Sequence, residues 1–109
     1  MPAVAYSIEL VPKARDHIKT FTGRQRATVV DAMKHQLLHE PAVATRQRKP
    51  MKADMPGYVA PWELRVGELR VYYEVLEDRK VVRVLGLGIK DRNRVLFGGR
   101  ETEVDPCEQ

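Results

Sequence analysis

The sequence predicts an α+β fold: a small antiparallel sheet, made of an N-terminal strand and three C-terminal strands, with two N-terminal helices packed on one face. Three observations lead to it. Residues 5–11 alternate between apolar and polar side chains, residues 12–39 repeat at helical spacing, and alternation returns from residue 62. Alternation is typical of strands, and a period of about 3.6 residues of amphipathic helices. The 109 residues suit one domain, expected over residues 1–99, with a flexible tail at 100–109.

The composition is that of a soluble globular protein, with 43% hydrophobic and 31% charged residues. No apolar run approaches the roughly 20 residues that span a bilayer. No basic segment precedes the apolar N-terminal residues, so we expect no signal peptide. The single cysteine, Cys107, excludes an internal disulfide and a zinc-type spacing. We expect a cytoplasmic protein without metal or cofactor, and the net charge of +4 suits a polyanion or an acidic protein partner.

The first half of the chain contains one strand and two helices. In the strand at residues 5–11, Tyr6, Ile8 and Leu10 share a face. Pro12 suits a first helical turn, where its missing N–H has no intrahelical partner. The first helix has a narrow apolar stripe of Ala14, Ile18 and Phe21, and Thr22-Gly23 ends it. A second helix is predicted over residues 24–39. Its apolar face consists of Ala27, Val30, Met33, Leu37 and Leu38.

Residues 41–60 show no period and hold three of the chain's seven prolines, so we predict a long loop. Long loops within compact domains are often functional. This one carries the basic residues Arg46, Arg48, Lys49 and Lys52.

The stretch WELRVGELRVYYEV, Trp62 to Val75, alternates around a central Gly67-Glu68. A two-residue loop with glycine first suits a type II′ turn and predicts a β-hairpin. The hairpin sets these opposed pairs: Trp62 with Tyr73, Glu63 with Tyr72, Leu64 with Val71, Arg65 with Arg70, and Val66 with Leu69. The core face then carries Trp62, Leu64, Val66, Leu69, Val71, Tyr73 and Val75. The other face carries Glu63, Arg65, Arg70, Tyr72 and Glu74.

The opposed arginines are the unusual feature of this hairpin, because like charges placed opposite each other destabilise a sheet. Either an anion binds between them, or Glu63 and Glu74 neutralise them on a plain solvated face. A turn at residues 77–79 leads into a further strand, KVVRVLGLGI at 80–89. We expect its set Arg83, Leu85, Leu87 and Ile89 to face the helices, and Val82, Val84, Gly86, Gly88 and Lys90 to face away. The two glycines would then form a floor without side chains, rimmed by Arg65, Arg70, Lys90 and the loop lysines. A last short strand is predicted at residues 94–97.

Three stretches carry a resemblance to a known family: YSIELVPKARDHI, MKADMPGYVAPWELRVGELRVYYEV and KVVRVLGLGIKDR. From about Tyr6 to Phe97 the chain resembles the RelE/ParE superfamily of bacterial type II toxin–antitoxin toxins. The most specific motif is tryptophan, then L-R-V-G, then R-V-Y-Y. The resemblance implies a RelE-like fold and a cognate antitoxin protein as partner.

The resemblance also implies one of two activities. RelE-like members cleave mRNA in the ribosomal A site, whereas ParE-like members inhibit DNA gyrase and have no nuclease activity. A third alternative is a degenerate toxin that only binds its antitoxin. The fold does not choose between these. Cleavage of mRNA by a metal-independent attack of the ribose 2′-OH is our first expectation, because cations remain on the sheet face.

For that reaction the resemblance assigns Arg70 to the phosphate, Arg65 to the transition state and Lys90 to the leaving oxygen. Glu63 stands where a RelE-like nuclease has a catalytic lysine; it is either a general base or a counter-ion of Arg65. Leu96 or Phe97 occupies the position of a C-terminal catalytic tyrosine. The expected RNA contacts are Arg48, Lys49, Lys52, Tyr72 and Phe97. The histidines His17, His35 and His39 are expected on helix surfaces, without a catalytic role.

Overall fold

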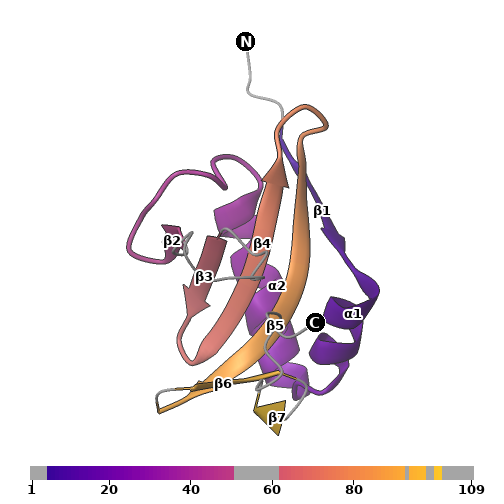
Figure 1. The fold of residues 1–109 in the computed structure, drawn as a ribbon, viewed down its shortest axis with the longest axis vertical. Coiled ribbons are helices and arrows are strands. Elements are labelled where there is room, and N and C mark those ends of the chain that lie inside the picture. Colours follow the sequence, from indigo (N-terminus) through magenta and orange to yellow (C-terminus); the bar gives the residue numbers. More distant parts are fainter. Residues whose placement is uncertain (1–4, 51–61, 93, 98–99, 102–109) are drawn as a thin grey trace.

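A single mixed sheet forms the centre of the molecule, and α2 crosses behind it (Figure 1). The computed structural model describes residues 5–50, 62–92, 94–97 and 100–101. Its elements are β1 (Ser7–Leu10), α1 (Pro12–Lys19), α2 (Gly23–Leu37), β2 (Arg48–Pro50), β3 (Trp62–Val66), β4 (Leu69–Leu76), β5 (Val81–Asp91), β6 (Arg94–Phe97) and β7 (Arg100–Glu101). The strand order is β2-β3-β4-β5-β6-β7, with β1 paired to β5. None of the helices in the described ranges is long and apolar enough to cross a membrane.

The α+β class is confirmed, but the expectation of a wholly antiparallel sheet is wrong at β1. This strand runs parallel to β5, with Ile8 beside Val82 and Leu10 beside Val84. Alternation determines which side chains face the core, but it carries no information on strand direction. Both α1 and α2 lie between β1 and the rest of the sheet in the chain, so no tight hairpin forces an antiparallel pairing.

The two helices begin where local chemistry predicts. Pro12 is the first residue of α1. Thr22 and Gln25 form a capping box before α2: the Gln25 N–H donates to Thr22 Oγ1 and the Thr22 N–H donates to Gln25 Oε1. The predicted α2 core face is partly wrong, since Ala27 is exposed and Val29 is fully buried. Val29 and Met33 lie one turn apart on the buried side, and Ala27 points about 200° away from Val29 around the helix axis.

The hairpin of β3 and β4 has the predicted register, and all five opposed pairs are present. Gly67 has a φ of 60°, in the left-handed region that the predicted turn requires. The predicted core face contributes fully buried side chains, Leu64, Val71 and Tyr73 among them. Together with residues of α1, α2 and β5 these form the hydrophobic core.

An irregularity in β5 changes the predicted orientation of its first half. Tyr72 lies opposite Gly86, but Tyr73 lies opposite Val84, so Leu85 is an extra residue without a partner in β4. Such a β-bulge reverses the alternation. Val82 and Val84 therefore face the core, against the prediction, and Arg83 joins Glu74 on the opposite face.

Beyond the bulge the prediction for β5 is correct. Leu87 and Ile89 lie opposite Val71 and Leu69 of the core face, whereas Gly86 and Gly88 lie opposite Tyr72 and Arg70. In the first half of β5 the charge of Arg83 is neutralised by two carboxylates, Glu74 at 3.4 Å and Glu9 of β1 at 3.9 Å.

The segment predicted as a loop contains β2, which pairs with β3 and places Arg48 opposite Leu64. Leu64 is a core residue, so Arg48 points to the helix side of the sheet and is only 7% exposed. Its guanidinium donates to the carbonyls of Val43 (2.9 Å) and Gln36 (2.7 Å) and to Gln36 Oε1 (3.0 Å). Arg48 thus joins β2 to the end of α2, and the expectation that it lies in an exposed basic loop is wrong.

The segment expected to be a tail begins as the short strand β7, where Glu101 pairs with Leu96. Residues 102–109 lie outside the described residues.

Replacing Arg48 by alanine should lower the free energy of unfolding by about 2–4 kcal/mol, because the part-buried acceptors on Val43 and Gln36 lose a charged donor. The neighbouring Arg46 is exposed, so Arg46→Ala is the matched control and should change stability by less than about 0.5 kcal/mol. Guanidinium denaturation followed by circular dichroism measures both. Equal stabilities of the two variants would contradict the structural role of Arg48.

Candidate functional site

The face of the sheet opposite α2 gathers most of the predicted site residues into adjacent rows. One row runs Lys49–Glu63–Tyr72–Gly86, and the next runs Arg65–Arg70–Gly88–Phe97, as the strand registers align them. Lys90 follows Gly88 by two residues and lies on the same face. We call this surface the charged face. Its side chains and glycines are Lys49, Glu63, Arg65, Arg70, Tyr72, Gly86, Gly88, Lys90 and Phe97.

The opposed arginines are held apart by separate partners within the protein. Arg70 is only 8% exposed, and its Nη1 donates to the carbonyls of Gly67 (2.7 Å) and Leu69 (2.8 Å) at the hairpin turn. Arg65 Nε donates to Glu63 Oε1 at 3.2 Å. Glu63 thus neutralises Arg65 as expected, but the expectation for Glu74 is wrong, since Glu74 pairs with Arg83 and backbone carbonyls hold Arg70. An external anion is not needed to explain the register, although it can still bind the exposed part of Arg65.

Glu63 links the two rows of the charged face. Its carboxylate accepts from Arg65 at Oε1 and from the Tyr72 hydroxyl at Oε2, the latter at 2.8 Å. The Glu63 side chain is 13% exposed, whereas that of Arg65 is 42% exposed. Arg65 is thus the part of this ion pair that an incoming ligand meets first.

The predicted floor of glycines does exist, but the protein's own side chains cover it. A Cβ on Gly88 would lie 2.5 Å from Val95 Cγ1 and 2.8 Å from the Leu96 carbonyl oxygen. A Cβ on Gly86 would meet Phe97 and His17 at 3.4–3.5 Å. The glycines therefore allow β6 and the Phe97 ring to lie close to the sheet, and the expectation of an open floor is wrong.

Phe97 is the centre of a small aromatic group on this face. Its ring lies 5.5 Å from that of Tyr72 and 5.3 Å from that of His17, both in tilted arrangements. Tilted pairs at this separation are favourable because the edge of one ring meets the face of the other. Tyr72 is 6% exposed and Phe97 is half-buried. Phe97 is therefore the member that a stacking ligand would contact.

His17 was expected on a helix surface, and this expectation is wrong. It lies on α1 but reaches the edge of the charged face, where its Nδ1 accepts a hydrogen bond of 3.1 Å from the Leu87 N–H. Burial lowers the pKa of His17, and Lys13 acts in the same direction while Asp16 opposes it. The sequence contained one signal for this contact, the glycine at position 86 that makes room for the ring. His35 and His39 are exposed, as expected.

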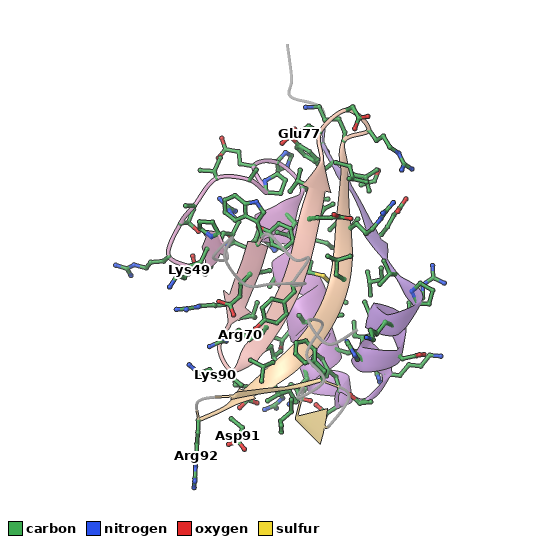
Figure 2. The ribbon with its side chains drawn as sticks, in the orientation of Figure 1. Lys49, Arg70, Glu77, Lys90, Asp91 and Arg92 are labelled. Carbon is green, nitrogen blue, oxygen red and sulfur yellow. The ribbon has the colours of Figure 1, made fainter. Side chains whose placement is uncertain are left out.

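The remaining predicted site residues do not all lie on the charged face. Lys49 and Lys90 are exposed. Figure 2 shows Lys90 close to Arg70 along the sheet, with Lys49 further along the same side. Arg48 points to the other side of the sheet, and Lys52 lies outside the described residues. The described charged face thus combines two exposed lysines, a half-exposed arginine paired with a carboxylate, and an aromatic ring.

No protein-family model and no curated protein sequence matches the chain. Solved structures do. A chain of the toxin–antitoxin complex RelBE2 from Mycobacterium tuberculosis superimposes with a TM-score of 0.65 at 21% identity, over 82% of this chain and 95% of that chain. A chain of the archaeal RelE–RelB complex from Pyrococcus horikoshii gives 0.62 at 14% identity, over 80% of this chain and 97% of that chain. The chain therefore has the RelE-like fold that the hairpin motif predicted.

Replacing Gly88 by alanine should lower the free energy of unfolding by about 1–3 kcal/mol, since the added methyl overpacks Val95 and the Leu96 carbonyl. Gly23 has nothing within 4 Å of an added Cβ. Gly23→Ala is the matched control, expected within about 0.5 kcal/mol of wild type. Urea denaturation followed by the fluorescence of Trp62 measures both. A Gly88→Ala protein as stable as wild type would show that β6 does not close over the glycines.

Proposed function

We propose that this chain is the toxin of a type II toxin–antitoxin pair, and that it inhibits translation by cleaving mRNA on the ribosome. Two findings support the toxin assignment: the RelE-like fold, and the toxin–antitoxin complexes from which both structural neighbours come. The observation that carries the nuclease assignment is the Arg65–Glu63 ion pair on the charged face, which also carries Lys90 two strands away on β5. Its partners would be a cognate antitoxin, the ribosome and mRNA, in the cytoplasm.

The proposed reaction uses the RNA's own nucleophile. The ribose 2′-oxygen forms a bond to the adjacent phosphorus, and the bond from phosphorus to the 5′-oxygen breaks. Negative charge grows on the phosphate oxygens, so fixed cations there lower the barrier. A base must take the 2′-proton, and an acid must protonate the leaving oxygen. The products are a 2′,3′-cyclic phosphate and a 5′-hydroxyl.

Arg65 and Glu63 would exchange partners during this reaction. In the free protein Arg65 occupies Glu63 Oε1, while the Tyr72 hydroxyl holds Oε2. A phosphate arriving at the exposed side of Arg65 competes with the carboxylate for the guanidinium, whose planar fork suits phosphate oxygens. Glu63 Oε1 then becomes available to accept the 2′-proton. Tyr72 keeps the carboxylate in position during the exchange.

Lys90 and Phe97 complete the proposed site. Lys90 is an exposed ammonium on the same face, suited to protonate the leaving 5′-oxygen. Phe97 cannot donate a proton, but its half-buried ring can stack on a base. Arg70 would act mainly on the protein, because its guanidinium holds the hairpin turn. Lys49 lies beside Glu63 in the register and would contact backbone phosphate.

A second candidate function is inhibition of DNA gyrase without chemistry. The observation that favours it is Phe97, which lacks the hydroxyl of a catalytic tyrosine and covers the glycines itself. Under this alternative the helices and the C-terminal tail, rather than Arg70, would make the essential contacts with gyrase.

Replacing Arg65 by alanine should reduce mRNA cleavage at least about 100-fold, the usual effect of removing one fixed group that stabilises a developing negative charge. Wild-type protein is added to a translating bacterial extract, and primer extension maps new 5′ ends within translated codons. Arg79→Ala is the matched control, since Arg79 is exposed in the turn between β4 and β5 and carries the same charge. It should cleave like wild type.

Gyrase supercoiling is followed with the same wild-type sample. Intact mRNA together with blocked supercoiling would replace the nuclease assignment by gyrase inhibition. Full cleavage by a folded Arg65→Ala protein would leave the nuclease assignment standing but remove Arg65 from the site.

A further inference from the structure

The contact between His17 and Leu87 occupies a gap in the edge of β5. β1 pairs with β5 at residues 81–84 and β6 pairs with it at residues 88–91. Between them this edge of the strand has no neighbouring strand among the described residues. The Leu87 N–H falls in the gap, and His17 Nδ1 satisfies it at 3.1 Å. Because a backbone N–H only donates, Nδ1 must be unprotonated.

This hydrogen bond determines the tautomer of His17. A neutral imidazole with an unprotonated Nδ1 carries its proton on Nε2. The lowered pKa of His17, caused mainly by burial, supports the neutral form at neutral pH. No buried side-chain nitrogen or oxygen of the described residues lacks a hydrogen-bond partner. His17 hydrogen-bonds within the described chain through Nδ1 alone. It follows that Nε2–H is accessible to solvent and able to donate.

This donor lies beside the aromatic ring of the charged face. The His17 and Phe97 ring centroids are 5.3 Å apart, with the rings inclined at 45°. Both side chains are half-buried, so part of each ring remains exposed to solvent. Phe97 also lies in the same row as Arg65 and Arg70. A ligand that spans this row meets cations at one end, and a ring with a neutral donor at the other.

We propose that His17 and Phe97 form a nucleobase subsite for single-stranded RNA, in which a base stacks on Phe97 and accepts a hydrogen bond from His17 Nε2–H. A base suits this position better than a phosphate, because the donor is neutral and the cations lie elsewhere in the row. Every base offers a face for stacking, but the acceptor atoms along its edge differ between bases. His17 is thereby a determinant of base preference. The inference rests on the proposed function, since it supplies the RNA.

The test separates the two nitrogens of the ring. In His17→Asn the amide oxygen can replace Nδ1 as acceptor for Leu87, but no donor replaces Nε2. In His17→Gln the longer amide can replace the Nε2 donor, but Nδ1 is lost. The probes are four 2′-O-methyl trinucleotides, one for each base, which lack the attacking hydroxyl. Binding is measured on the full-length protein by NMR titration, without ribosomes. His35→Asn is the control, because His35 is exposed on α2.

Wild type should distinguish the four trinucleotides. His17→Asn should bind the preferred one roughly 3- to 10-fold more weakly, as expected for one lost hydrogen bond, and should rank the four more evenly. His17→Gln should keep the ranking with a lower melting temperature. His35→Asn should match wild type in both respects.

Equal affinities of wild type and His17→Asn, including no binding by either, would overturn the inference. Cleavage is read separately from mRNA ends, so this result would leave the proposed function untouched. A measurement on the wild-type protein also tests the inference without relying on the folding of any variant. The Nε2 proton and nitrogen resonances of His17 should shift when the preferred trinucleotide is added, and unchanged resonances at saturation would also overturn the inference.

Discussion

The bulge at Leu85 is the constraint on which the charged face depends. Continued alternation along β5 would have placed Gly86 and Gly88 on the side of Val82 and Val84, in the core. Because of the extra residue, Val82 and Val84 face the core before the bulge, and Leu87 and Ile89 face the core after it. Gly86 and Gly88 therefore lie on the opposite face. Bulges often occur beside functional sites, where they redirect side chains. Here the redirected positions carry no side chain, and Phe97, Val95 and His17 fill the space.

The two arginines and the glutamate of this face each have a partner within the protein before any ligand arrives, whereas Lys49 and Lys90 are exposed. Arg70 holds the hairpin carbonyls, Arg65 holds Glu63, and Tyr72 holds the other oxygen of that carboxylate. Such an arrangement offsets the repulsion between opposed arginines and orients the groups in advance. It also means that a phosphate gains less from Arg65 than from a free guanidinium, because it must displace Glu63. In the proposed reaction that displacement is useful, since it exposes the base when substrate is present.

The sequence predicted some features of the molecule much better than others. The register of β3 and β4 followed from Gly67 and the alternation around it, because a two-residue turn leaves one pairing. The bulge could not be predicted. Both alternating sets of side chains in β5 contain valine, leucine or isoleucine, so the apolar pattern does not reveal an extra residue. The burial of Arg48 and the contact of His17 depend on tertiary neighbours, which a helical or loop pattern does not encode. The sequence leaves Glu63 open between a general base and a counter-ion of Arg65; the structure shows the ion pair with Arg65 and adds a hydrogen bond from Tyr72.

In the proposed reaction the RNA's own 2′-hydroxyl is the nucleophile, and the charged face moves protons and stabilises charge. The chemistry of the cut ends tests it most directly. Fragments made by the wild-type protein on translating ribosomes are isolated, and both new ends are identified by mass spectrometry. Attack by the 2′-hydroxyl would leave a 2′,3′-cyclic phosphate, or the 3′-phosphate formed from it, on the upstream fragment and a 5′-hydroxyl on the downstream one. A 3′-hydroxyl with a 5′-phosphate would mean that water attacked the phosphorus, and would rule out the proposed reaction.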